Sequence, residues 1–138
     1  MTENRTVVIV DDTEDMRLIA STIIRRSPEG KNLDIAEAAS ADDGLRLIEA
    51  RVRGAVPTLV LCDYRMPGKD GIDLFRALKA RGLDRGCTFV LLTSVDNPAH
   101  RLEARAAGVE TVIEKPFGVQ AWRDLIGRLL GQWRVGAP

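Results

Sequence analysis

Short apolar runs alternate with longer amphipathic stretches along this chain of 138 residues. The apolar runs are rich in β-branched side chains and are mostly continuous, which is typical of strands that are covered on both faces. They predict strands at Thr6–Val10, Leu33–Ala38, Leu59–Cys62, Thr88–Leu92 and Thr111–Glu114.

Between these runs, apolar residues recur three and four positions apart, the spacing of an amphipathic helix. Together with capping residues, glycines and prolines, this spacing predicts where the helices begin and end. The predicted helices are Glu14–Arg26, Ala41–Arg53, Ile72–Arg81, a polar helix from Asn97–Pro98 to Gly108, and Val119–Trp133. The strict alternation predicts a (βα)5 fold, in which right-handed crossovers place helices on both faces of a parallel sheet.

Side chains that can carry chemistry stand at the ends of four of the predicted strands. Asp11 and Asp12 follow the first strand, and Asp63 follows the third. Thr93 follows the fourth strand and Lys115 the fifth. Because the carboxyl ends of parallel strands share one edge of the sheet, these groups are expected to converge there. Three acids, a hydroxyl and a lysine predict a site for a divalent cation and a phosphoryl group.

Composition narrows the possible partners. The formal net charge is zero, from 20 basic and 20 acidic residues, so no overall basic field would attract nucleic acid or an anionic membrane. The apolar runs are far too short to span a membrane, and residues 1–5 show no signal-peptide pattern. We therefore expect one cytoplasmic domain over residues 1–138, with its core at about 5–133 and no output domain.

The motifs resemble the receiver domain of two-component response regulators, in the CheY-like superfamily. The matching residues are Asp11–Asp12, Asp63 with Met66–Pro67–Gly68 and Asp70–Gly71, Thr93, and Lys115–Pro116–Phe117. Each motif is common by chance, but their occurrence in this order, each at a strand end, is a specific signal. The resemblance implies a flavodoxin-like three-layer fold with the strand order 2-1-3-4-5.

The resemblance also implies a role for each acid. Asp63 would be the phosphoacceptor, taking a phosphoryl group from a phosphohistidine of a sensor histidine kinase or phosphotransfer protein. Asp12 and Asp63 would bind Mg²⁺ directly, together with the backbone carbonyl of Arg65. Asp11 would contact the ion through water. Oxygen ligands with several retained waters suit Mg²⁺ well.

Lys115 and Thr93 would each donate a hydrogen bond to the phosphoryl group. The Lys115–Pro116 bond is expected to be cis, as the family implies. Movement of Thr93 would shift residues 94–97 and the polar helix. That shift would remodel the face formed by the fourth helix, the fifth strand and the fifth helix. A downstream protein, or a second copy in a phosphorylation-dependent dimer, would bind this face.

Several positions depart from the family pattern or have open roles. Val112 stands three residues before Lys115, where the family usually has an aromatic ring, which puts the usual threonine–aromatic coupling in doubt. Arg65, two residues after Asp63, is expected to alter the lifetime of the acyl phosphate. Tyr64 is expected either to shape access to Asp63 or to cover it. His100 is expected to be solvated, and Trp133 to be the more exposed of the two tryptophans.

The main prediction is a phosphoacceptor switch that modifies only itself and is not a turnover enzyme. It would be a stand-alone protein or phosphorelay intermediate, or part of a longer regulator cut at Pro138. The first alternative is a receiver-like interaction module that acts without phosphorylation. A haloacid-dehalogenase-type hydrolase would need a second acid where Arg65 stands. A flavodoxin-type cofactor module would need a hydroxyl-rich loop, but four of the five residues 11–15 are acidic.

Overall fold

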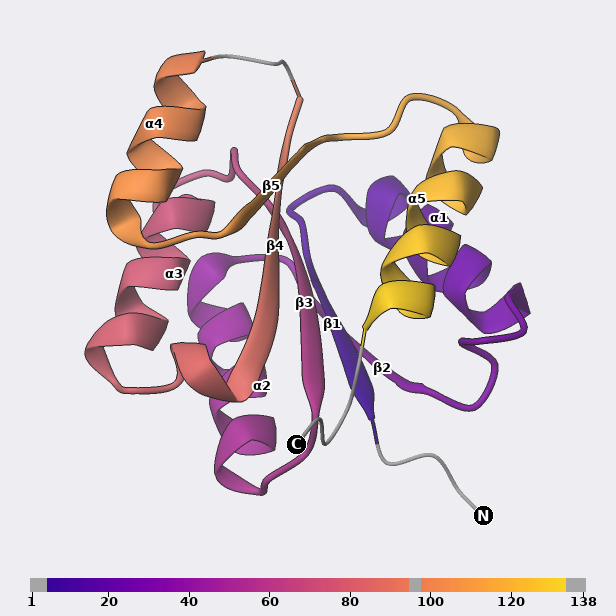
Figure 1. Cartoon of the computed structure of the whole chain (residues 1–138), viewed down its shortest axis with the longest axis horizontal. Coiled ribbons are helices and arrows are strands. Elements are labelled where there is room, and N and C mark those ends of the chain that lie inside the picture. Colours follow the sequence, from indigo (N-terminus) through magenta and orange to yellow (C-terminus); the bar gives the residue numbers. More distant parts are fainter. Residues whose placement is uncertain (1–4, 95–97, 134–138) are drawn as a thin grey trace.

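A parallel five-stranded sheet in the order β2-β1-β3-β4-β5 forms the centre of the molecule (Figure 1). The computed structural model describes residues 5–94 and 98–133. The strands are β1 (Thr6–Val10), β2 (Asp34–Ala38), β3 (Thr58–Asp63), β4 (Cys87–Thr93) and β5 (Thr111–Glu114). The helices are α1 (Glu14–Arg26), α2 (Ala41–Arg53), α3 (Gly71–Ala80), α4 (Pro98–Ala107) and α5 (Val119–Gln132), with a 3₁₀ turn η1 (Asp84–Gly86). This is the predicted flavodoxin-like fold.

The ends of the elements differ from the predictions by a residue or so. The strands β3 and β4 extend to Asp63 and Thr93, so these polar residues are the last of their strands and do not follow them. The turn η1 was not expected from the sequence. The predicted capping residue of α4, Asn97, lies outside the described residues.

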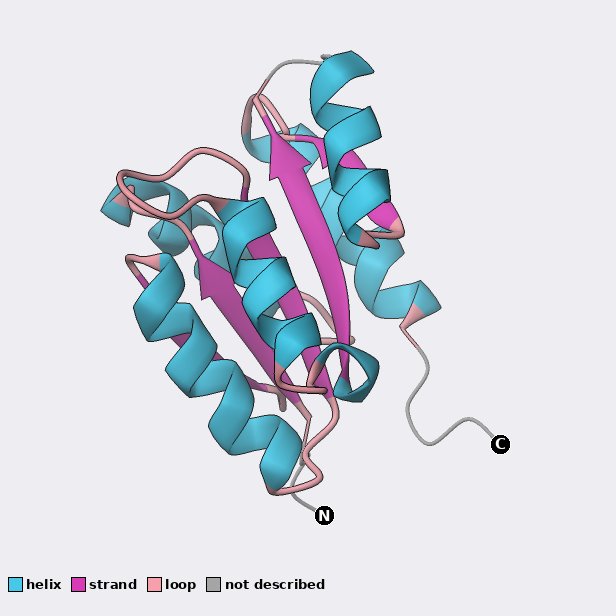
Figure 2. Cartoon of the chain, turned by 90° about the vertical axis from the view of Figure 1, so that its left-hand side faces the viewer, coloured by secondary structure: helices cyan, strands magenta, loops and turns pink. Residues whose placement is uncertain are grey.

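Two apolar layers cover the sheet. The helices α2, α3 and α4 lie on one face, which Figure 2 views from the front, and α1 and α5 lie on the other (Figure 1). Side chains alternate between the two faces along each strand. In β1, Val8 and Val10 join the first layer, whereas Val7 and Ile9 join the second.

The tryptophans of the C-terminal helix region both pack into the α1–α5 layer. Trp122 is buried within α5, and Trp133, the residue that caps this helix, is only 8% exposed. Trp133 is the more exposed of the two tryptophans, as predicted, although both are buried, since Trp122 is 3% exposed. The guanidinium of Arg5 lies 5.0 Å from the centre of its ring and helps to cover it.

The register of the strands determines which residues meet at the carboxyl edge. Val10 of β1 pairs with Cys62 of β3, so the next residues, Asp11 and Asp63, emerge side by side. Asp63 pairs with Leu92 of β4, the residue before Thr93. Thr93 in turn pairs with Glu114, directly before Lys115. One edge thus collects the acids, the hydroxyl and the lysine.

Candidate functional site

Three carboxylates gather where β1 and β3 end. One oxygen from each of Asp11, Asp12 and Asp63 lies within 4.8 Å of the others. Asp11 is 5% exposed and Asp63 is 8% exposed, whereas Asp12 lies open to solvent. Asp11 is fixed in place because its carboxylate accepts a hydrogen bond of 2.9 Å from the backbone N–H of Thr13.

Lys115 reaches into this cluster from the end of β5. Its Nζ lies 2.7 Å from Oδ2 of Asp11 and 3.4 Å from Oδ2 of Asp63. Burial lowers the pKa of Lys115, but the hydrogen bond to Asp11 and the charge of Asp63 outweigh burial, so the pKa is raised overall. The ammonium therefore stays charged beside Asp63.

The peptide bond between Lys115 and Pro116 is trans, because the described residues contain no cis bond. The prediction of a cis bond is therefore wrong. The trans isomer is the one that X-Pro bonds usually favour. The backbone N–H of Lys115 donates to the carbonyl of Thr93, and this ladder contact directs the lysine side chain to the site without a cis bond.

Asp63 is a weaker acid than an ordinary aspartate. Burial, reinforced by the charges of Asp11 and Asp12, raises its pKa to about 6, although Lys115 acts in the opposite direction. Like charges and a partly desolvated setting both disfavour the ionised form. A divalent cation among the three carboxylates would remove this conflict, so the donor set fits a hard, oxygen-preferring ion such as Mg²⁺.

Thr93 adds a buried hydrogen-bond donor at the end of β4. Its hydroxyl oxygen has no hydrogen-bond partner among the residues that the structure describes. Buried hydroxyl groups normally have a partner, and leaving one without a partner costs about 1–3 kcal/mol. Because Thr93 ends the strand next to Asp63, an oxygen-rich ligand bound at Asp63 would supply the missing acceptor.

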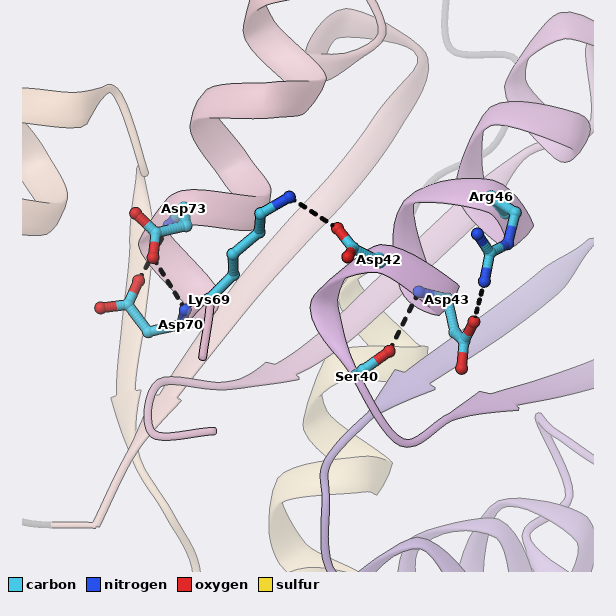
Figure 3. Close-up of polar contacts among 7 residues, drawn as sticks. All are labelled: Ser40, Asp42, Asp43, Arg46, Lys69, Asp70 and Asp73. Carbon is cyan, nitrogen blue, oxygen red and sulfur yellow. Dashed lines mark hydrogen bonds and ion pairs between the residues drawn. The ribbon is translucent and has the colours of Figure 1, made fainter. Parts of the chain in front are cut away.

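The loop after Asp63 is held at both ends. The backbone N–H of Gly71 donates to the carbonyl of Tyr64, which closes the loop. Asp70 and Asp73 form a reciprocal capping box at the start of α3, and Lys69 forms an ion pair with Asp42 of α2 at 2.9 Å (Figure 3). The loop that carries the Arg65 carbonyl is thus fixed by a helix cap and by a contact with α2.

Gly71 cannot be replaced without moving this loop. A Cβ atom built there would lie 2.5 Å from Cδ1 of Leu91 and 2.6 Å from the backbone oxygen of Asp63. Both distances are far shorter than any normal carbon contact. The Asp70–Gly71 motif therefore combines a helix cap with a close approach of α3 to the end of β3.

Comparison with known families agrees with this geometry. The family model of the response regulator receiver domain matches residues 7–127. The chain belongs to this family. The match covers strands β2 to β5, all of β1 except Thr6, and every motif residue described above.

The alignments with three relatives each cover nearly the whole of both chains. Chemotaxis protein CheY of Pseudomonas aeruginosa is 32% identical over 123 residues, which are 89% of this chain and 94% of that protein. The phosphorylated cyanobacterial phytochrome response regulator RcpA has the same fold, with a TM-score of 0.79 at 16% identity over 94% of each chain. The Mn²⁺-bound form of response regulator Rcp1 has a TM-score of 0.76 at 15% identity over 97% of each chain.

The structure of this receiver domain brings together four of the predicted site residues. Asp11, Asp12, Asp63 and Lys115 form one cluster, and Thr93 ends the adjacent strand. The side chain of Arg65 is exposed, and it lines the open hollow beside the acids together with Asp12 and His100. In the described part of the chain, no helix is long and apolar enough to cross a membrane.

His100 is the residue that the sequence analysis misplaced. Its imidazole stacks on the ring of Tyr64, with the ring centres 4.4 Å apart and an angle of 20° between the planes. Tyr64 also donates a hydrogen bond of 3.3 Å to Oε2 of Glu103. The prediction that His100 is solvated is wrong, because the side chain is half-buried against this ring. The spacing of His100 and Glu103 on one helix face was the available signal, but it does not reveal what that face contacts.

Proposed function

We propose that this receiver domain is a phosphoacceptor switch in which Asp63 takes a phosphoryl group from a phosphohistidine. The donor would be a sensor histidine kinase or a phosphotransfer protein. The observation that carries this proposal is the position of the Asp63 carboxylate between two other acids and 3.4 Å from the Lys115 ammonium. A buried carboxylate beside the Lys115 ammonium fits a role as nucleophile for an incoming phosphoryl group.

The metal-binding part of the proposal assigns ligands to a Mg²⁺ ion. Asp12 and Asp63 would contact the ion directly, and the backbone carbonyl of Arg65 would be a third protein ligand. Asp11 would contact it through water, since Lys115 and Thr13 already hold its carboxylate. When bound, the ion supplies positive charge for the phosphoryl oxygens in the transition state.

In the proposed transfer, a carboxylate oxygen of Asp63 attacks the phosphorus of the donor. An O–P bond forms as the N–P bond of the phosphohistidine breaks, and its electron pair returns to the imidazole nitrogen. Lys115 holds its charge beside one phosphoryl oxygen, and the Thr93 hydroxyl donates to another. The hydroxyl, which has no partner within residues 5–94 and 98–133, thereby gains an acceptor.

The proposed domain is a switch that works through protein partners. It catalyses only its own phosphorylation and dephosphorylation, and it acts in the cytoplasm. A downstream protein reads the state of the α4-β5-α5 face, and the domain is a monomer or a phosphorylation-dependent dimer. This chain does not itself bind nucleic acid, in keeping with a net charge of zero.

Chemical trapping tests which residue is modified. The domain is incubated with a small phosphoryl donor and Mg²⁺, and is then treated with borohydride, which reduces an acyl phosphate of aspartate to homoserine. We expect tandem mass spectrometry to find this change at Asp63 and at neither Asp11 nor Asp12. Reduction at another position, or at none, would overturn the assignment of Asp63.

A further inference from the structure

The helix α4 buries few apolar side chains against the rest of the molecule. Its buried residues are only two alanines, Ala104 and Ala107, and its one large apolar side chain, Leu102, is 68% exposed. By comparison, α3, of the same length, buries four large apolar side chains. Burial of apolar side chains is the main source of helix attachment, so we expect α4 to depend more than α3 on a few specific side-chain contacts.

Tyr64 supplies two of those contacts. It directly follows Asp63, and its side chain is buried, with the residue only 9% exposed. His100 and Glu103 lie three residues apart on α4 and therefore share one helix face. The imidazole stacks on the Tyr64 ring, and the Glu103 carboxylate accepts from its hydroxyl. We call these three residues the Tyr64 clamp.

A third contact joins α4 to β5 without using an aromatic ring. The guanidinium of Arg101 donates a hydrogen bond of 3.0 Å to the backbone carbonyl of Val112. The valine side chain has no ring and no polar group through which it could follow a movement of Thr93. Tyr64, by contrast, belongs to the phosphoacceptor loop and places an aromatic ring against α4.

We propose that the Tyr64 clamp holds α4 in its unphosphorylated position and couples that position to the state of Asp63. This inference rests on the function proposed above. Tyr64 is joined to Asp63 by one peptide bond, and its backbone N–H donates to Leu92 of β4 at 2.8 Å. Adding a phosphoryl group to Asp63 changes the charge and the contacts at the base of the ring. The clamp then loosens, and α4 shifts.

Coupling of this kind is reciprocal. If phosphorylation weakens the clamp, then weakening the clamp by mutation must favour the phosphorylated arrangement by the same factor. A clamp variant should therefore bind a phosphoryl analogue more tightly, even though the mutated side chain is not part of the acidic cluster.

The test uses two clamp variants and one control on the same helix. Tyr64→Phe keeps the stacked ring but removes the hydrogen bond, and His100→Ala removes the stack but keeps Tyr64. Arg105→Ala changes an exposed residue of α4 and is the matched control. Amide hydrogen exchange is measured on the free protein, and beryllofluoride affinity is measured in the presence of Mg²⁺.

We expect exchange within α4 to rise about fivefold in each clamp variant, the effect of losing one net hydrogen bond or ring contact. Exchange in α2 should not change, and beryllofluoride affinity should rise severalfold. Arg105→Ala should match the parent in both measurements. Unchanged α4 exchange in both clamp variants would overturn the proposal.

Faster α4 exchange with unchanged beryllofluoride affinity would refute the coupling, because reciprocity would be violated. A parent protein that binds Mg²⁺ but no beryllofluoride would instead contradict the proposed function. Exchange in the free variants would then still decide whether the clamp holds α4. The two failures are therefore distinguishable.

Discussion

At the scale of single residues, Asp63 combines burial, two neighbouring acids and one lysine. The net result is a carboxyl group whose pKa is raised to about 6 from the ordinary value of 3.8. The folded protein therefore binds this proton more tightly than the unfolded chain does. The contribution of this proton to the free energy of unfolding is fully present below pH 4 and is lost as pH rises through 6.

Replacing Asp63 by asparagine should stabilise the metal-free protein at pH 7.5. The variant removes a charge whose ionisation opposes folding, and Lys115 keeps Asp11 as its partner. We expect a gain of about 1–2 kcal/mol in the free energy of unfolding, after allowing for partial solvent screening. Urea denaturation in the presence of a chelator measures it. The gain should vanish near pH 4, and an equal gain at both pH values would contradict the electrostatic explanation.

Proton competition should make Mg²⁺ binding depend on pH. Because Asp63 must be ionised to bind the cation, affinity should fall about tenfold for each pH unit below 6 and level off above 7. The dissociation constant for Mg²⁺ would be measured at each pH by tryptophan fluorescence or by calorimetry. A flat profile between pH 5 and 7 would mean that Asp63 is not a ligand.

Sequence alone located most residues of the site, for a physical reason. Parallel strands must deliver their carboxyl ends to one edge, so Asp11, Asp63 and Lys115 could be placed together without coordinates. The sequence did not reveal that His100 stacks on Tyr64, because that contact depends on how α4 rotates against the sheet. Hydrophobic periodicity does not define the rotation of a helix with so few apolar residues.

At the scale of elements, the start of α3 sets the position of the phosphoacceptor loop. The capping box of Asp70 and Asp73 holds the first turn, and the absence of a Cβ at Gly71 lets the helix approach β3 closely. The sequence predicted a helix here that begins one residue late, since glycine is a poor helix former. Close packing, which sequence does not show, compensates for that poor propensity.

Gly71→Ala should therefore damage both stability and the site. The added methyl group would meet the backbone oxygen of Asp63, which cannot move as a flexible side chain could. We expect a loss of about 1–3 kcal/mol in the free energy of unfolding and weaker Mg²⁺ binding. Gly127→Ala is the matched control, because a Cβ built there has no described atom within 4 Å apart from its chain neighbours and the nearby backbone of its own helix. If both variants behaved alike, the close approach of α3 would have no energetic role.

At the scale of the whole molecule, the sheet separates two apolar layers, and we expect both layers to unfold together. Ile48 packs in the layer under α2 and α3, and Ile126 packs in the layer under α5. The (βα)5 pattern predicted both layers, because strands covered on both faces need helices on each side. The alternation alone fits several crossover patterns, so the layer of each helix followed from the strand order 2-1-3-4-5, which the family resemblance implied and the structure has.

Truncation of either buried isoleucine should cost about 2–5 kcal/mol. Ile48→Ala and Ile126→Ala lie on opposite faces of the sheet, so their effects should add in the double variant. Denaturant unfolding followed by both fluorescence and circular dichroism would measure this. Separate transitions for the two layers would contradict a single cooperative unit.

The most direct test of the central claim is intact-protein mass spectrometry after incubation with acetyl phosphate. The parent and Asp63→Ala are compared, each with and without Mg²⁺. We predict a gain of one phosphoryl group in the parent only when Mg²⁺ is present, and no gain in Asp63→Ala. A gain in the Asp63→Ala variant, or no gain in a folded parent that binds Mg²⁺, would contradict the proposal that Asp63 is the phosphoacceptor of this receiver domain.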